Sequence, residues 1–120
     1  MNRVDRSNIE TFRDLGGQPK MLALDSDTPT YQMKIYDTVI VATSSEADGT
    51  GIITLPSLAE AVGKFFFISA PTGATAGDIS LYEKETGAEL TTYGDLDADD
   101  DHVLLFSDGL NWRVVLDGVA

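Results

Sequence analysis

The chain has 120 residues, 42% of them hydrophobic, and a formal net charge of −12 from eight basic and twenty acidic residues. This length accommodates one domain with one modest core. Cysteine is absent, which excludes a disulfide framework and a thiolate metal site. The acidic surface argues against nucleic-acid binding, because it repels phosphates. No apolar run approaches the roughly 18–20 residues of a membrane span, and the N-terminus lacks a signal-peptide core, so no membrane contact is expected.

The first thirty residues differ in composition from the rest of the chain. Ser7 is a suitable N-cap for a short helix, which the pair Gly16-Gly17 would end. A brief apolar run over residues 21–24 precedes the polar stretch 25–29. Because these segments hold too few apolar residues for a core, we expect residues 1–30 to form an extended arm and residues 31–120 to form a β-domain.

From Tyr31 onward, β-branched and aromatic runs alternate with turn residues. We expect a bend at Asp37, one helical turn over Ser57–Gly63, a hairpin at Asp108-Gly109, and strands within residues 31–43, 51–55, 64–69, 78–83, 88–93, 102–106 and 112–116. No internal repeat is evident. This spacing predicts an all-β fold, a small antiparallel β-sandwich or barrel-like domain that follows the N-terminal arm.

The last strands are apolar on both faces. In a regular strand, Val103 and Leu105 face one way and Leu104 and Phe106 the other. The final strand is expected to alternate in the same way, with Val115 facing away from Trp112, Val114 and Leu116. A strand that is apolar on both faces must be covered on both. In so short a chain, the second cover is expected to be another copy of the chain.

This argument predicts a homo-oligomer. Its interface is expected to contain Phe65, Phe67, Leu104, Phe106, Trp112 and Val115. The alternative is a two-layer sandwich that buries one face of the sheet fully and the other partly.

The stretch from Gly51 to Val115 carries an ordered set of short motifs. A strand ending in Leu55-Pro56 is followed by an Ala-rich turn and by Gly63-Lys64-Phe65, and the stretch ends with Ser-Asp-Gly-x-Asn-Trp over residues 107–112. This combination resembles the β-domain of bacteriophage virion proteins, which include head and tail fibres and small capsid-associated proteins. The resemblance implies a trimer without enzymatic activity. A free-standing copy with an arm is more similar to a capsid decoration, or cement, protein than to a fibre with a long shaft.

The resemblance therefore implies a structural protein, synthesised in the host cytoplasm, that decorates the outer capsid surface of the virion and stabilises the head by bridging capsomers. The expected partners are two further copies of the chain and the major capsid protein, with no cofactor. Capsid binding is assigned to the N-terminal arm, through Arg3, Arg6, Ile9, Phe12, Arg13 and Leu15. The alternative is a receptor- or carbohydrate-binding tip of a head or tail fibre, for which exposed aromatic side chains could come from Tyr31, Tyr36, Tyr82 and Tyr93.

The acidic loop before residue 102 is the sharpest local motif. Its alternating carboxylates, Asp95, Asp97, Asp99 and Asp101, suggest a calcium loop. However, Asp100 stands where such a loop needs glycine and Phe106 where it needs glutamate, so a solvated acidic loop is the better interpretation and no metal site is expected. His102 is the single histidine, and no nucleophile accompanies it in a recognisable motif. We therefore expect no catalytic residues.

Overall fold

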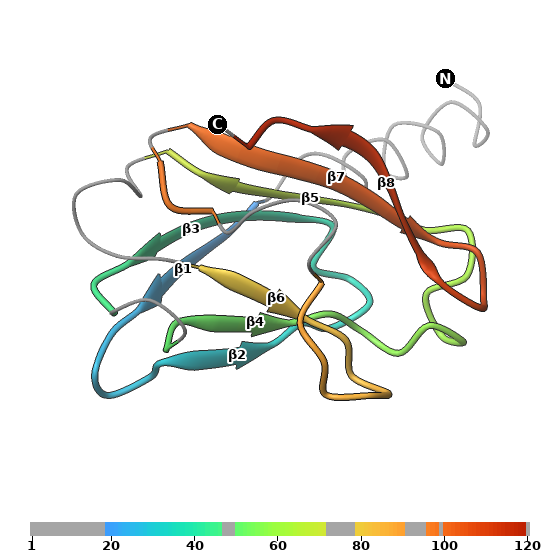
Figure 1. The fold of residues 1–120 in the computed structure, drawn as a ribbon, viewed down its shortest axis with the longest axis horizontal. Coiled ribbons are helices and arrows are strands. Elements are labelled where there is room, and N and C mark those ends of the chain that lie inside the picture. The colour runs from blue at the N-terminus through green and yellow to red at the C-terminus, as the bar shows by residue number, and fades with distance from the viewer. Residues whose placement is uncertain (1–18, 47–49, 72–78, 91–95, 99, 120) are drawn as a thin grey trace, which may run out of the picture.

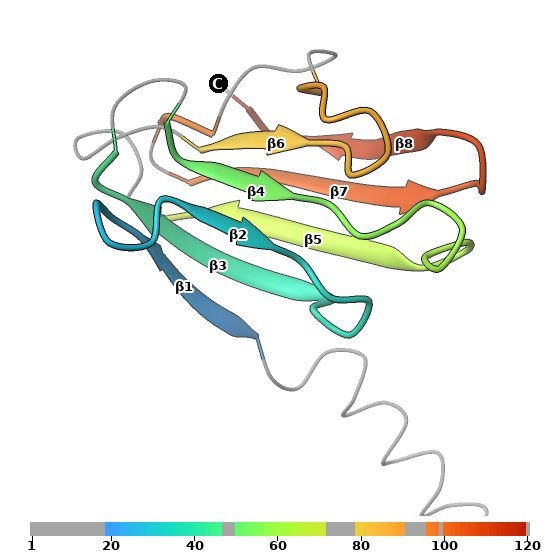
Figure 2. The same cartoon turned by 90° about the horizontal axis from the view of Figure 1, so that it is seen from below.

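The computed structural model describes residues 19–46, 50–71, 79–90, 96–98 and 100–119. These residues form two facing β-sheets and no helix (Figures 1 and 2). The five-stranded sheet has the order β1 (Lys20–Leu24), β3 (Val39–Ser44), β5 (Phe65–Ala70), β7 (Asp101–Ser107) and β8 (Trp112–Asp117). The three-stranded sheet has the order β2 (Thr30–Gln32), β4 (Ile52–Thr54) and β6 (Ser80–Tyr82). The all-β, sandwich-like prediction is confirmed.

The expected antiparallel pairing is wrong for most of the fold. From β1 to β6, the chain changes sheet after every strand, so that each strand returns to its own sheet in the same direction. The β1–β3, β3–β5, β2–β4 and β4–β6 pairs are therefore parallel. The antiparallel pairs are β5–β7 and β7–β8, and β7 and β8 follow one another within the five-stranded sheet.

This path repeats itself in space, although the sequence shows no evident repeat. Ile40 of β3 pairs with Ile68 of β5, and Ile52 of β4 pairs with Ser80 of β6, so both pairs are 28 residues apart. Successive circuits of the chain thus stack strand on strand, as in solenoid proteins. The β7–β8 hairpin closes one end of the larger sheet.

The β-fold begins before the expected domain boundary at residue 30. Residues 20–24 form β1, which pairs with β3, and Leu24 is buried in the core. Residues 19–30 therefore belong to the fold, and only residues 1–18 of the expected arm lie outside the described residues.

The single helical turn expected over Ser57–Gly63 is confirmed, whereas the expected strand 88–93 is only partly described. Over Ser57–Gly63, the Ala61 amide donates to the Ser57 carbonyl at 3.0 Å, which gives a single turn and no helix. Gly63 ends that turn with a φ of 75°, in the left-handed region that favours glycine. Within the expected strand 88–93, the described residues form a bridge between Glu89 and Tyr82, the Ala88 carbonyl accepts the Glu83 amide, and the Leu90 amide donates to the Leu81 carbonyl.

The hydrophobic core lies between the two sheets and is closed within one chain. Phe66 and Ile68 of β5 alternate with outward residues and are fully buried, as are Val103 and Leu105 of β7. The smaller sheet covers them from the other side with inward residues that include Ile53 and Leu81. A second copy is therefore not needed to cover the inner face, and the two-layer alternative describes this part of the fold.

A β-bulge changes the faces of β8. Leu105 pairs with Val114 and Leu104 with Leu116, so that Val115 is an extra residue without a partner position on β7. The prediction that Leu116 shares a face with Trp112 is therefore wrong, because the bulge turns Leu116 to the opposite face. Trp112 itself is buried, and its ring meets Phe66 edge-on with 5.7 Å between centroids.

Deleting Val115 is expected to be tolerated. Losing a residue from a strand normally moves every following side chain to the other face, but here the deletion would leave Leu116 opposite Leu104 in a regular ladder. The Tm of this variant is expected to stay close to that of the wild type. Deleting Val41 from β3, where the pairing has no bulge, is the matched control and is expected to disrupt the fold. Equal losses of Tm would contradict the register.

Candidate interaction surface

The outer face of the five-stranded sheet is a broad apolar surface. One row of paired residues across it consists of Val39, Phe67, Leu104 and Leu116. A second row begins with Met21 and Val41, and a third contains Phe65 and Phe106. Large side chains on this surface are uncovered: Met21 is 71% exposed, Phe65 54% and Leu116 48%. We call this surface the outer apolar face, formed by Met21, Val39, Val41, Phe65, Phe67, Leu104, Phe106 and Leu116.

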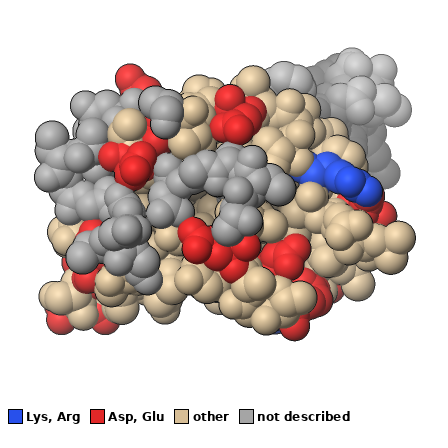
Figure 3. All heavy atoms as spheres, viewed as in Figure 1, with Lys and Arg blue, Asp and Glu red and all other residues tan. Residues whose placement is uncertain are grey.

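Within the described strands, no carboxylate lies on the outer apolar face, in a protein with twenty acidic residues. The two acidic residues within its strands, Asp101 and Asp117, stand in register with the inward-facing Ala70 and Val103. The titratable groups within its strands that share the face are His102 and Arg113. On the side of the molecule that Figure 3 shows, Asp and Glu atoms are spread over the described surface and outnumber Lys and Arg atoms. Among the described strand residues, the acidic side chains thus lie off the outer apolar face.

Two hollows indent this face. The larger has a volume of about 380 Å³ and is lined by Thr38, Val39, Gly63, Lys64, Phe65, Phe67 and Leu104. The other, of about 320 Å³, lies beside β1 and is lined by Met21, Leu22, Ala23, Val41, Thr43 and Pro71. Phe65 and Phe106 pack with 5.5 Å between ring centroids, and the His102 ring stacks on Phe67 at 5.7 Å. Aromatic side chains that pack against one another thus shape this surface.

The structure brings together four of the six residues of the expected interface. Phe65, Phe67, Leu104 and Phe106 share the outer apolar face, whereas Trp112 is part of the core. Val115 lies in the bulge of the edge strand β8 and is 52% exposed. Sequence reasoning missed four residues of this face: Met21, Val39, Val41 and Leu116. The apolar run 21–24 is the signal that could have added Met21, had it been assigned to a strand.

The outer face of the three-stranded sheet is different in character. Its outward positions alternate with the buried Ile53 and Leu81. They are mainly polar, and Ser80 among them is buried: Thr30, Gln32, Ile52, Thr54, Ser80 and Tyr82. Of the two outer faces, only that of the larger sheet is suited to bury apolar area against a partner.

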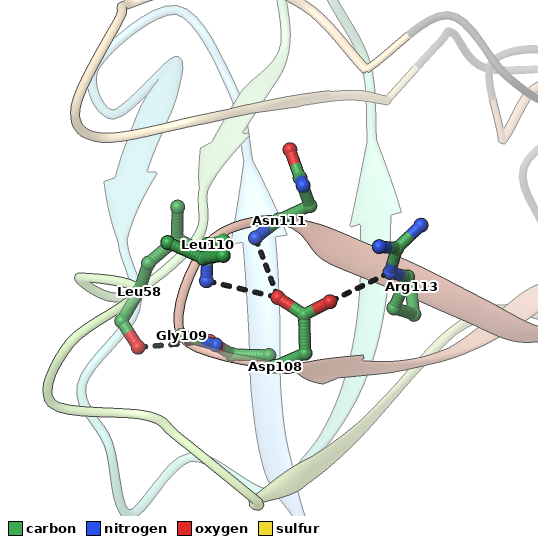
Figure 4. A network of polar contacts seen from close by, with 7 residues as sticks. Leu58, Asp108, Gly109, Leu110, Asn111 and Arg113 are labelled. Carbon is green, nitrogen blue, oxygen red and sulfur yellow. Dashed lines mark hydrogen bonds and ion pairs between the residues drawn. The ribbon is translucent and has the colours of Figure 1, made fainter.

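The β7–β8 loop, drawn in Figure 4, is organised by one carboxylate. Asp108 Oδ1 accepts the amides of Leu110 and Asn111 at 2.8 and 2.7 Å, and Asp108 Oδ2 accepts Arg113 Nε at 2.8 Å. These donors, the Asn111 amide foremost, lower the pKa of Asp108 to about 2. The loop projects Leu110 into solvent, where it is 81% exposed. The hairpin expected at Asp108-Gly109 is confirmed, with Gly109 at a φ of 93°.

Asp108 is expected to make the hairpin acid-sensitive. Because its folded pKa is lowered from 3.8 to about 2, its stabilising contribution is present above about pH 4 and is lost as the pH falls through about 2. Asp108→Asn keeps an acceptor for the two amides but removes the charge. This variant should be less stable than the wild type at pH 7, and the difference should shrink between pH 4 and 2 in urea unfolding. Asp27→Asn controls for the loss of one exposed charge, and a constant difference across the range would contradict the assignment.

The acidic loop gives no metal centre among the described residues. Asp101 is buried, and its Oδ2 accepts the amides of Asp97 and Ala98 at 3.1 and 2.9 Å, so it acts as a structural acceptor for its own loop. No group of three or more His, Asp or Glu side chains that could hold a metal ion is found in the described ranges. Asp95 and Asp99 lie outside those ranges.

The four tyrosines occupy different environments. Tyr31 faces the core side of β2, and its hydroxyl donates to Asp37 Oδ2 at 2.7 Å. Burial, together with Asp37, raises the pKa of Tyr31 to about 12. Tyr36 is 75% exposed, whereas Tyr82 is half-buried. Tyr93 lies outside the described residues, as do the arm residues Arg3, Arg6, Ile9, Phe12, Arg13 and Leu15.

Comparison of the chain with protein-family models, curated proteins and solved structures finds no match. Within the described residues, no helix has the length and apolar character needed to span a membrane.

Proposed function

We propose that this chain is a structural protein that assembles into a trimer through its outer apolar face and decorates the outer surface of a bacteriophage head, where it bridges capsomers. The observation that carries the assembly is the outer apolar face itself, uncovered by the described residues and free of carboxylates. The phage setting is supported by the resemblance of residues 51–115 to virion β-domains. Activity in this role is binding alone, without chemistry.

The area of the outer apolar face is smaller than that of a standard protein interface. Five strands about 4.8 Å apart and six residues of about 3.3 Å each give a flat footprint of about 480 Å². A standard interface buries roughly 800 Å² on each partner. The face is thus a substantial part of an interface but needs contacts from outside the sheet. Three such faces turned toward one axis would remove their apolar side chains from water while the acidic surfaces stay apart.

Analytical ultracentrifugation of the purified chain tests the assembly. We expect the wild type to sediment as a trimer and Phe67→Lys, at the centre of the outer apolar face, to sediment as a monomer. Thr54→Lys is the matched control, because Thr54 is an outward residue on the central strand of the other sheet. The control should remain a trimer. A wild type that stays monomeric at all concentrations would contradict the proposal.

Mixing the chain with empty phage heads tests the decoration role. The wild type is expected to co-sediment with the heads and to raise their thermal stability. Removal of residues 1–18, which precede β1, should leave the trimer intact and weaken its attachment, since the three arginines of the arm lie in that segment. Full attachment without these residues would exclude the arm, and a trimer that ignores heads would exclude decoration.

A receptor- or carbohydrate-binding tip is the second candidate, favoured by one groove. This groove, of about 430 Å³, lies beyond the C-terminal ends of β2, β4 and β6 and is lined by Gln32, Met33, Lys34, Ile35, Tyr36, Pro56, Ser57, Glu60 and Lys84. Asp37 Oδ2 accepts the Lys34 amide at 2.9 Å, which fixes the turn that presents Tyr36. An exposed aromatic ring beside amide, hydroxyl and ammonium groups is suited to a saccharide.

Saccharide binding at this groove can be tested by titrating a panel of bacterial surface glycans. Under this second candidate, Tyr36→Ala should abolish binding and Tyr82→Ala, away from the groove, should preserve it. The absence of binding by the wild type to every glycan of the panel would exclude the second candidate and leave the structural role untouched.

A further inference from the structure

We propose that Leu110 of one copy inserts into the 380 Å³ hollow on the outer apolar face of the next copy and thereby locks the oligomer. This inference rests on the assembly proposed above. It supplies a contact from outside the sheet, which the outer apolar face needs to reach the area of a standard interface. The projecting element and the hollow both belong to this chain, so every copy offers one of each.

The projecting element is built to hold its shape. Leu110 is the most exposed large apolar residue described, at 81%. Its amide is held by Asp108, and the neighbouring Gly109 amide donates to Ser107 Oγ at 3.1 Å. Ser107 Oγ in turn donates to the Leu58 carbonyl at 2.8 Å, which ties the loop to the body of the fold (Figure 4). A leucine presented by an ordered loop pays little entropy when it is buried.

The hollow is suited to receive an aliphatic side chain. Its walls are mainly apolar, with Val39, Phe65, Phe67 and Leu104 around it. Gly63 leaves one wall open, because no atom lies within 4 Å of the position that a Cβ would take there. Leu110 does not line the hollow of its own chain. The cavity is therefore free to accept a side chain from outside.

Charge and symmetry favour a second copy as the occupant. Lys64 lines the hollow and forms no ion pair among the described residues, whereas Asp108, which lies next to Leu110, is paired with the exposed Arg113 of its own chain. Docking would bring these opposite charges together. When such a contact is made head to tail it is heterologous, and it closes into a ring when the rotation between copies is a fraction of a full turn. One projecting leucine and one hollow per copy are what a three-membered ring uses.

Disulfide trapping gives a direct test, because the chain contains no cysteine. Differently tagged Leu110→Cys and Val39→Cys proteins are mixed and oxidised, and we expect a covalent heterodimer, since a disulfide requires Cα atoms within about 7 Å. Leu110→Cys mixed with Thr43→Cys is the control, because Thr43 lies on the same strand as Val39 but outside the hollow. Cross-linking no greater than that of the control would overturn the proposal.

Association constants separate this contact from the assembly as a whole. Leu110→Ala is expected to raise the trimer dissociation constant roughly 10- to 100-fold, because burying one leucine is worth one to two powers of ten in affinity. Leu110→Asp should weaken it further, with unchanged unfolding of the subunit. If both variants assemble like the wild type while Phe67→Lys is monomeric, the Leu110 contact is wrong and the assembly stands. A monomeric wild type would overturn both.

Discussion

Phe66→Ala is expected to lower the free energy of unfolding by about 3–5 kcal/mol, the usual cost of emptying a buried phenylalanine site. Phe66 is fully buried at the centre of the five-stranded sheet and meets Trp112 edge-on. Since a domain of this size has a total stability of only about 5–15 kcal/mol, the loss is a large share of the whole. Trp112 is the single tryptophan, so its fluorescence in urea titrations reports directly on this contact.

The neighbouring Phe65 provides the control. It differs from Phe66 by one position, faces outward and is 54% exposed, so Phe65→Ala should cost only about 1 kcal/mol in subunit stability. The same variant should weaken assembly, whereas Phe66→Ala should act on folding. Both variants must be compared at one protein concentration, because association shifts apparent stability. Similar unfolding costs for the two would show that the faces of β5 have been assigned wrongly.

Local features of this fold follow from local chemistry and were accessible from the sequence. The in-out alternation of Val103 to Phe106 is as predicted, because a strand places successive side chains on opposite faces. The bend at Asp37 is real, since its carboxylate accepts the Lys34 amide and the Tyr31 hydroxyl. The Asp108 turn was recognisable for the same reason: short carboxylates bind nearby amides.

Pairing partners were not accessible, because they depend on contacts between distant segments. Alternating apolar residues indicate that a strand has a buried face. They do not indicate which sheet the strand joins, or whether it runs parallel or antiparallel to its neighbours. The chain changes sheet after β1 through β5, and this path converts the expected antiparallel hairpins into parallel stacks. The run 21–24 is short, and residues 1–30 as a whole hold too few apolar residues to predict that it joins a core. Only its register with β3 shows that it belongs to the sheet.

The candidate surface was predictable in part for a related reason. Phe65 and Phe67 follow from alternation within one strand, and so do Leu104 and Phe106. Leu116 did not follow, because the bulge at Val115 reverses the alternation and leaves no clear mark in a run of two valines and a leucine. The hollow is also beyond sequence reasoning, since Val39, Gly63 and Leu104 come from three distant segments.

Ser107 is expected to show the second large effect, because its hydroxyl joins three parts of the fold. It is fully buried, donates to the Leu58 carbonyl and accepts the Gly109 amide. Ser107→Val would leave the Leu58 carbonyl and the Gly109 amide without this partner. Ser107→Thr would keep the hydroxyl in a side chain of the same size as valine. Since an unsatisfied buried polar group costs roughly 1–3 kcal/mol, the valine variant should unfold at correspondingly lower free energy than the threonine variant.

The comparison of these two variants also links the hairpin to assembly. Because Ser107 anchors the loop that carries Leu110, Ser107→Val should loosen the loop and raise the trimer dissociation constant, whereas Ser107→Thr should leave it close to that of the wild type. Urea unfolding gives the first difference and sedimentation equilibrium the second. If valine and threonine variants unfold alike, the hydroxyl is not the anchor of the loop. If they differ in unfolding but assemble alike, the order of the loop does not contribute to the contact between copies.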